Sequence, residues 1–120
     1  MSATPRQLGP EVPGFVPPPH PAGLHQSGAY VVLEPLSADL HAADLHRAFS
    51  VDDALWDYLG YGPFAGAAAY HRWVKERETG LGPVFFALRD RVTGHACGVA
   101  SVLRIDPANG VLETGHICLS

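Results

Sequence analysis

The chain has 120 residues, 47% of them hydrophobic and 17% charged, a size and composition that allow one domain and not two. Eight basic residues against twelve acidic ones give a net charge of −4, and no run of Lys and Arg occurs, so we expect no binding to nucleic acid. No apolar stretch approaches the roughly 20 residues of a membrane helix, and neither a secretory signal nor a disulfide framework is present, so we expect a cytoplasmic protein without membrane contact.

Proline dominates residues 1–28, which hold most of the eleven prolines in the chain. This density favours extended polyproline geometry without internal hydrogen bonds. Two alternatives remain open for this leader: a disordered segment, or an arm that lays Phe15 and Val16 across the surface of the domain. The folded part is expected to be residues 29–120.

A first strand is predicted over residues 29–36, where β-branched and aromatic residues precede Pro35. Ser37 follows and offers its hydroxyl as the N-cap of a helix. That helix carries one apolar stripe, whose members repeat at helical spacing and are expected to face the core. The stripe consists of Ala38, Ala42, Leu45 and Phe49.

A second, shorter helix is predicted after Ser50, which would act as its cap, with Asp53 three residues on in a capping-box position. A third helix is predicted from about residue 64 to residue 78, and Gly80 is its expected stop signal. The expected inward side of this third helix consists of Tyr70, Trp73 and Val74.

The hydrophobic pattern then changes from a helical to a strand-like period. Strands are predicted at 83–88, 96–105 and 111–119, and the segments 90–94 and 106–110 between them carry turn residues. Turns at these spacings favour an antiparallel meander. The predicted fold class is therefore α+β: one strand, two to three helices, then a three-stranded antiparallel meander.

Seven histidines invite a metal hypothesis, which their spacing does not support. His41 and His46 lie five residues apart, so they do not share a helix face as ligands at i and i+4 do. No HExxH motif and no zinc-finger spacing of Cys and His occurs, so we predict no metal and expect histidines at the surface or at helix caps. Cys97 lies in mid-strand and is expected to pack. The GxG fragments at 60–62 and 80–82 are expected to break helices.

Four aromatic residues gather where the short helix meets a Gly/Pro loop: Trp56, Tyr58, Tyr61 and Phe64. Two interpretations remain open for them. They pack in the core, or they line the wall of a pocket, since side chains at such a loop often surround a pocket mouth.

Glu113 lies in the last predicted strand, among apolar and glycine neighbours. Strand alternation puts Glu113, Ile117 and Leu119 on one face of the sheet, with His116 and Cys118 on the other. The carboxylate of Glu113 is either solvent-facing or a buried general base.

Five segments spread along the chain resemble, in the same order, those of one enzyme family. They are GPEVPGFVPPPHP, AYVVLEPL with the following HAADL, LWDYLGYGPFA, PVFFALRDRVTGHACGVASVLRIDPANGVLE and TGHICLS. The chain resembles the GNAT superfamily of N-acetyltransferases, and within it the RimJ/RimL-type members. DRVTG followed by GVAS is similar to a hairpin typical of the superfamily, and SVLRIDPANGVLETGHI is similar to the narrower subgroup. Residues 29–120 then resemble the N-terminal portion of a GNAT domain.

The resemblance implies transfer of an acetyl group from acetyl-CoA to a primary amine, a protein N-terminus in some members and a small amine in others. The amine must lose a proton before it attacks, and by position Glu113 is the first candidate base and His116 the second. The resemblance also implies a bulge in the strand 111–119, whose backbone N–H polarises the thioester oxygen. The expected contacts with the pantetheine arm are backbone groups of Ile117, Cys118 and Leu119. Relatives tend to carry an aromatic pair at the positions of Cys118 and Leu119, so we expect the main-chain contacts to remain and ring surface to be lost.

Relatives of this kind continue with a Gly-rich loop that opens a helix and holds the CoA pyrophosphate. The sequence reaches Ser120 before such a loop, so we expect the N-terminal half of an acetyltransferase, truncated and inactive by itself. The alternative is a non-enzymatic α+β binding or interaction module, or a gene relic, that keeps only the amine-side pocket. The last strand is expected to form an open sheet edge through which copies self-associate.

Overall fold

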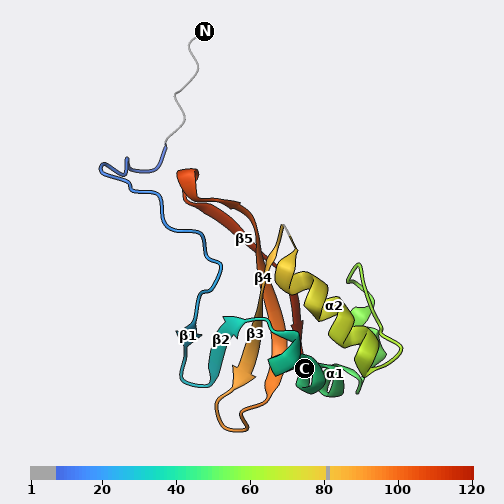
Figure 1. Cartoon of the computed structure of the whole chain (residues 1–120). Coiled ribbons are helices and arrows are strands. Elements are labelled where there is room, and N and C mark those ends of the chain that lie inside the picture. Colours follow the sequence, from blue (N-terminus) through green and yellow to red (C-terminus); the bar gives the residue numbers. More distant parts are fainter. Residues whose placement is uncertain (1–7, 81) are drawn as a thin grey trace.

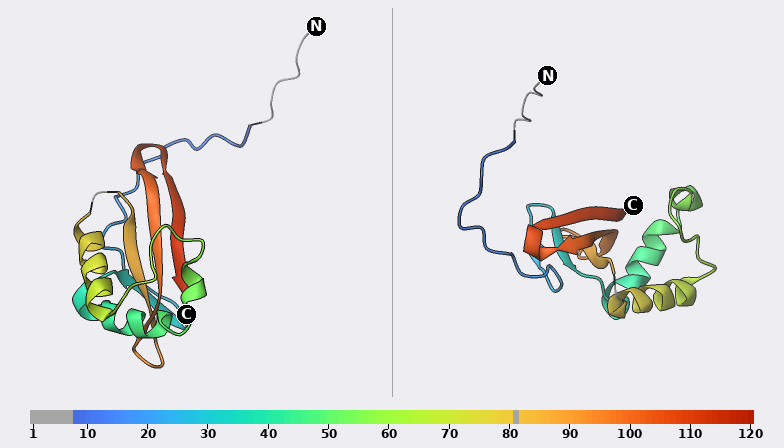
Figure 2. Two further views of the ribbon diagram at one scale, coloured as in Figure 1. Left: turned by 90° about the vertical axis from the view of Figure 1, so that its right-hand side faces the viewer. Right: turned by 90° about the horizontal axis from the view of Figure 1, so that it is seen from above.

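The computed structural model describes residues 8–80 and 82–120. Its centre is a five-stranded antiparallel sheet whose strands lie in chain order. Both α-helices cover the same face of this sheet (Figure 1, Figure 2), which confirms the predicted α+β class. The elements are β1 (Gln26–Ser27), β2 (Val31–Pro35), α1 (Ala38–Phe49), the 3-10 helix η1 (Asp53–Trp56), α2 (Ala67–Thr79), β3 (Val84–Asp90), β4 (Ala96–Asp106), the 3-10 helix η2 (Pro107–Asn109) and β5 (Val111–Leu119).

The first strands differ from the expectation. β2 begins at Val31, later than predicted, and pairs antiparallel with β3. β1 is an additional short strand in which Gln26 pairs with Leu33 of β2. The sheet takes in these residues of the Pro-rich segment because the free edge of β2 offers unpaired backbone groups.

Helix α1 forms as predicted, together with its cap. The Ser37 hydroxyl oxygen accepts a hydrogen bond from the Leu40 N–H at 3.3 Å, and all four stripe residues are buried. His41 is buried as well, and its Nδ1 accepts from the Ser37 N–H at 2.9 Å. This histidine therefore caps the helix, but from the core and not from the surface.

The segment after α1 corrects one prediction. The hydroxyl of Ser50 donates back to the carbonyl oxygen of His46, so it belongs to the C-terminal end of α1 and is not an N-cap. The short helix is η1, and its cap is Asp52, whose Oδ1 accepts from the Ala54 N–H at 3.0 Å. An aspartate directly before the turn can reach its free N–H groups, which a residue already engaged by α1 cannot do.

Helix α2 begins at Ala67, three residues later than predicted, because the preceding Gly66 is extended and acts as its N-cap. It ends where predicted, with Gly80 as its C-cap. Leu81 lies outside the described residues, so the predicted break at 80–82 is described only at its two glycines.

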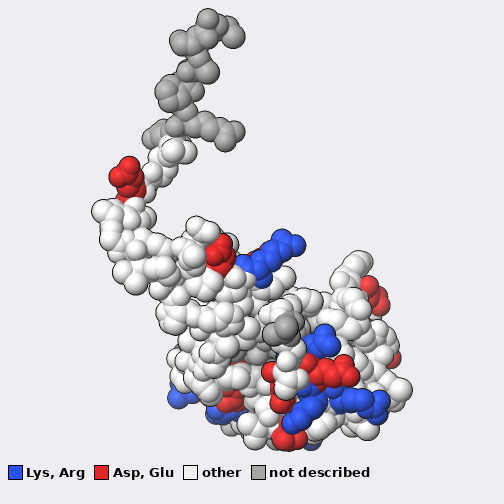
Figure 3. Space-filling model, turned by 45° about the horizontal axis from the view of Figure 1, so that its top comes forward, with Lys and Arg blue, Asp and Glu red and all other residues white. Residues whose placement is uncertain are grey.

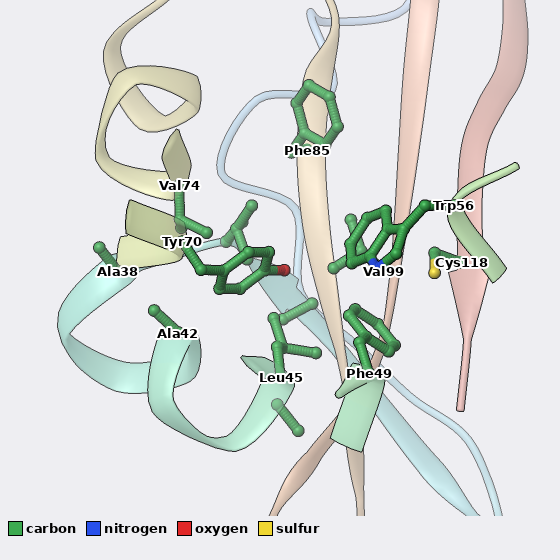
Figure 4. Packing of buried hydrophobic residues seen from close by; sticks show 13 residues of the cluster. Ala38, Ala42, Leu45, Phe49, Trp56, Tyr70, Val74, Phe85, Val99 and Cys118 are labelled. Atoms are coloured by element: carbon green, nitrogen blue, oxygen red, sulfur yellow. The ribbon is translucent and has the colours of Figure 1, made fainter. Parts of the chain in front are cut away.

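The core lies between the two α-helices and the sheet face that they cover (Figure 4). The ring of Phe49 stands edge-on to Trp56, with 5.7 Å between the ring centroids. Tyr70 and Val74 are buried and Trp73 packs against the cluster, which confirms the predicted inward side of α2.

β4 and β5 form a long hairpin that reaches past the helices (Figure 1). Its turn is η2 followed by Gly110 with a φ of +65°. Phe15 of the Pro-rich segment lies against this turn, since a Cβ placed on Gly110 would stand 3.0 Å from the Phe15 Cζ. Phe15 thus makes the contact expected of an arm, whereas Val16 is exposed. The division of the chain between residues 28 and 29 stays a prediction, and residues 1–7 lie outside the described part.

Neither α-helix of residues 8–80 and 82–120 combines the length and apolarity needed to cross a membrane. Within the same residues, no three side chains of His, Cys, Asp or Glu come together where they could hold a metal ion. Figure 3 shows charged side chains of both signs intermingled on one face of the molecule, with no basic surface among them.

Candidate active site

Strand β5 contains a β-bulge at His116. Ser101 of β4 pairs with Gly115, but Val99, two residues before Ser101, pairs with Cys118. β5 therefore holds one extra residue, and His116 has a φ of +49°. A left-handed backbone costs about 1–2 kcal/mol at a residue other than glycine and persists only where the surroundings hold it. The bulge implied by the family resemblance is thus present in this strand.

The bulge makes the expected alternation of β5 wrong. Strict alternation put Glu113 on the opposite face from His116 and Cys118. Gly115 pairs with the buried Ser101, so Glu113, two residues before Gly115, lies on the helix-facing side of the sheet. Cys118 lies in the core on that same side. The extra residue delays the alternation by one position, so that both candidate bases share a face.

Glu113 lies in the outer part of the hairpin, paired with Leu103 of β4. Its side chain is 49% exposed, and its Oε2 forms an ion pair with the Arg104 Nη1 at 3.0 Å. The carboxylate of Glu113 therefore faces solvent, which is one of the two alternatives that the sequence left open.

A cavity of about 150 Å³ opens beside the bulge, between the loop before α2, the end of α2 and the start of β3. It is lined by Tyr61, Trp73, Arg77, Gly80, Pro83, Phe85 and His116. The ring centroids of Tyr61 and Trp73 are 4.5 Å apart, and that of His116 is 6.0 Å from Tyr61 and 5.4 Å from Phe85. The fold thus brings four rings from four separate segments around one space.

The four aromatic residues predicted from the sequence divide between core and surface. Tyr61 lines the cavity. Trp56 is buried in the core, and Phe64 packs edge-on against it with 5.5 Å between centroids, so core packing describes both. Tyr58 is fully exposed. Residues two positions apart on a helical turn point to different sides, which is why Tyr58 leaves the cluster that Trp56 joins.

Sequence reasoning missed Arg77 as a cavity residue. Trp73 and Arg77 are four residues apart on α2, and the Arg77 Cζ lies 5.4 Å from the centroid of the Trp73 ring. The spacing of four residues could have indicated that Arg77 lies on the same face of the helix as Trp73. Trp73 was expected on the inward side of its helix, and the structure adds that it lines the cavity together with Phe85 of β3.

No protein-family model matches the sequence, and no curated protein matches it. Solved structures do match. A GCN5-related N-acetyltransferase from Brucella melitensis is 37% identical, with a TM-score of 0.82, over 91% of this chain and 50% of that one. A protein described as a probable acetyltransferase of the GNAT family, from Chromobacterium violaceum ATCC 12472, is 27% identical, with a TM-score of 0.81, over 99% of this chain and 60% of that one. The chain has a GNAT-like fold.

A third match shows this fold and no more: the GNAT-family acetyltransferase from Bacillus anthracis is 10% identical, with a TM-score of 0.62, over 81% of this chain and 54% of that one. The chain spans about half the length of the solved proteins that it matches. The resemblance to the GNAT superfamily is therefore confirmed at the level of the fold, and the RimJ/RimL subtype stays a prediction.

The phenol and thiol groups around the site are neutral in this GNAT-like fold. Burial raises the pKa of the Tyr61 hydroxyl, and the nearby Cys118 raises it further, whereas Arg77 lowers it. Burial likewise raises the pKa of Tyr70 and of the Cys118 thiol. Cys118 is therefore a packed thiol and not an activated nucleophile.

After the bulge, the backbone groups of Ile117, Cys118 and Leu119 point alternately toward β4 and toward the open edge of the sheet. The Ser120 N–H donates to the Cys97 carbonyl oxygen at 3.0 Å. Since hydrogen-bonded pairs alternate along an antiparallel ladder, Cys118 bonds to β4, while the backbone groups of Ile117 and Leu119 point to the open edge of the sheet. The sequence analysis treated the three residues alike, and the ladder separates them.

Proposed function

We propose that this chain supplies the acceptor pocket and the acetyl-donor strand of an N-acetyltransferase of the RimJ/RimL type, which moves an acetyl group from acetyl-CoA to a primary amine. The observation that carries the proposal is the bulged edge strand β5 beside an aromatic cavity, in a chain with a GNAT-like fold. Because the chain spans about half the length of its matches, the activity of a whole protein is itself part of the proposal.

Acetyl-CoA would supply an activated thioester carbonyl. The residues that would hold its pantetheine arm are Ile117 and Leu119, because within residues 8–80 and 82–120 no further strand pairs with their N–H and C=O groups at the sheet edge. Pantetheine is rich in amides, and a free strand edge offers the donors and acceptors with which amides pair. Both side chains are exposed aliphatic groups that can cover the arm. The described backbone therefore fits this part of the cofactor.

His116 is the better placed of the two candidate bases. An amine attacks a thioester only after it has lost its extra proton, so a group at the site must take that proton up. His116 lines the cavity, stacked near Tyr61. Glu113 does not line the cavity and is engaged by Arg104. We assign proton uptake to an imidazole nitrogen of His116 and keep Glu113 as the second candidate.

The amine end of the acceptor would enter the cavity between Tyr61, Trp73 and Phe85, with Trp56 and Phe64 supporting these rings from the core. A cavity of about 150 Å³ is smaller than the roughly 300–1,000 Å³ of pockets that enclose a whole ligand. The acceptor is then a small amine, or a protein N-terminus of which only the end is enclosed.

Titration of the ¹⁵N-labelled chain with acetyl-CoA, followed by NMR, tests the proposed donor strand. We expect shifts of the Ile117 and Leu119 amide signals, and the same shifts with pantetheine, because the proposed contacts involve only that arm. Gln26 and Ser27, at the opposite edge of the sheet, are the internal control. Shifts at that edge with none in β5, or no shift at all, would count against the proposal.

Turnover is tested by the release of CoA thiol on a panel of primary amines. From the sequence, the 120 residues by themselves are expected to give no rate above background. A rate that depends on acetyl-CoA, and that falls in His116→Asn, would contradict that expectation and support the transfer chemistry directly. Asparagine is the suitable replacement because it tolerates the left-handed backbone at this position.

The alternative of a non-enzymatic module makes a different prediction. Such a module would bind amines in the cavity, while β5 would not respond to acetyl-CoA. A cytoplasmic location is also proposed, and free Cys97 and Cys118 are compatible with its reducing conditions.

A further inference from the structure

The cavity beside the bulge has an unusual charge balance for a site that would receive an amine. Among the described residues that line it, Arg77 is the one with a permanent charge, and none is Asp or Glu. Its guanidinium carbon lies 5.4 Å from the Trp73 ring centroid, and its charge offsets part of the rise that burial causes in the pKa of the Tyr61 hydroxyl. A fixed positive charge therefore stands beside the aromatic walls.

Arg77 is held only loosely by its protein neighbours. Its Nη2 lies 3.6 Å from the Glu76 Oε2, and the two side chains are 40% and 62% exposed. An exposed pair of this kind is worth little, because water screens it and both side chains stay mobile. The guanidinium thus keeps donors that a ligand can use, and they lie in the planar fork that binds an oxyanion through two parallel hydrogen bonds.

A larger cavity of about 310 Å³ adjoins this one and shares four lining residues with it, Arg77, Gly80, Pro83 and Phe85. It is lined by a carboxylate, Glu78, one oxygen of which is occupied by the backbone. It accepts a hydrogen bond from the Ala38 N–H, and it lies 3.7 Å from the Lys75 Nζ. One oxygen of Glu78 is therefore committed to the start of α1, so this carboxylate offers less to a second ammonium group than a free one would.

The aromatic rings by themselves would suit a cation, because an ammonium group binds to the face of such a ring. Arg77 already lies over Trp73, so it repels a second cation and attracts an anion at the same place. A diamine would find no counter-charge here, whereas an amino acid would bring a carboxylate to the guanidinium.

We propose that the acceptor is a primary amine that also carries a carboxylate, and that Arg77 at the end of α2 binds this carboxylate. The inference rests on the proposed function in so far as that function makes the ligand an amine. It adds the second half of the ligand and names Arg77 as the residue that selects it.

Titration of the ¹⁵N-labelled chain with L-leucine, L-leucinamide and 1,4-diaminobutane tests this assignment. The side-chain N–H signal of Trp73 reports on the cavity, and that of Trp56, which does not line it, is the internal control. We expect L-leucine to shift the Trp73 signal saturably and to bind about tenfold more tightly than the amide, which lacks the anion. The diamine should bind no better than the amide.

Arg77→Gln should lower the affinity for L-leucine by about tenfold and leave that for L-leucinamide unchanged. Arg72→Gln is the matched control, since Arg72 is exposed on the same helix and does not line the cavity. Arg77→Lys should give an intermediate affinity, because it keeps the charge but not the planar fork.

Equal binding of L-leucine and L-leucinamide, tighter binding of the diamine, an Arg77→Gln variant that binds like the wild type, or no saturable shift of Trp73 would each overturn the assignment. The titration uses no acetyl-CoA, so its outcome is separate from that of the proposed function. Arg77-dependent binding of L-leucine without any response of β5 to acetyl-CoA would support this inference and contradict the acetyl transfer. A response of β5 with equal binding of acid and amide would do the reverse.

Discussion

At the residue scale, Glu34 joins three elements through one carboxylate. The Arg89 Nε of β3 donates to its Oε1 at 2.8 Å, and the His41 Nε2 of α1 lies 3.1 Å from the same oxygen. Because the His41 Nδ1 accepts from the Ser37 N–H, its Nε2 carries the proton and donates to Glu34. The bond from Arg89 is the main cause of the lowered pKa of Glu34, while burial opposes the shift and His41 adds to it.

Glu34→Gln should lower the free energy of unfolding by about 1 kcal/mol at neutral pH. Since folding lowers the pKa of Glu34 from 4.5, the ion pair stabilises the fold above that pH, and this contribution is lost as the pH falls through the folded value. In urea unfolding, the difference between wild type and variant should shrink as the pH falls below 4.5. Glu76→Gln, in an exposed pair, should show almost no difference. A Glu34→Gln difference that stays constant with pH would contradict the account.

Gly62 is the second residue whose identity the structure explains. Its φ is +78°, and a Cβ placed on it would stand 2.6 Å from a ring carbon of the buried Trp56. Gly62→Ala should therefore destabilise the fold by about 2–4 kcal/mol, from backbone strain together with overpacking. Gly60→Ala, with nothing within 4 Å of its Cβ position, should cost less than about 1 kcal/mol. Chemical unfolding measures both variants, and equal losses would show that the contact with Trp56 is not the cause.

At the scale of the elements, the sequence pattern specified α1 most completely, because its cap and its stripe are local features. Leu45 is 0% exposed at the centre of the stripe, whereas Leu40 on the same helix is 73% exposed. Leu45→Ala should lower the free energy of unfolding by about 2–5 kcal/mol, through lost burial and the cavity that it leaves. Leu40→Ala should change it by less than about 0.5 kcal/mol. Urea unfolding at one pH compares the two, and similar losses would contradict the assignment of the buried face.

Strand β5 was predicted with the right bounds, but its internal geometry was not. Its existence and bounds follow from the residues at 111–119, but the bulge at His116 leaves no mark in the alternation of apolar residues. A bulge arises because the two strands of a pair must match their twist and registers, which is a property of the pair and not of either strand. One extra residue moved Cys118 into the core with Glu113 on the same face, and only the register with β4 reveals it.

At the scale of the whole molecule, β5 is the last strand of the described sheet, with its outer backbone groups free (Figure 1). Ile117 and Leu119 are exposed there, and an apolar strand edge is a template for pairing with a second copy. We expect concentration-dependent self-association in sedimentation velocity. Ile117→Lys should reduce it, because a charge on an edge strand opposes strand addition, whereas Val92→Lys, in the exposed turn between β3 and β4, should not. A monomer at every concentration would contradict this expectation.

The sequence by itself determined the elements whose signals are local: the cap at Ser37, the stripe on α1, the stop at Gly80 and the order of the meander. These follow from contacts within a few residues, so periodicity and turn chemistry are enough to predict them. The tertiary structure decided the features that depend on residues far apart in the chain, which are the bulge in β5 and the cavity beside it.

The sequence marked an aromatic cluster, but it could not say which rings would face outward, inward or into a cavity. Tyr58 points to solvent and Trp56 to the core, while Tyr61 meets Trp73 and His116, which lie 12 and 55 positions further along the chain. The cavity, its single arginine and the bulge arise where separate elements meet, and no short stretch of sequence contains that information. The length of the chain argued against a second domain, and its charge argued against binding to nucleic acid. The packing between the helices and the sheet decided where the candidate site lies.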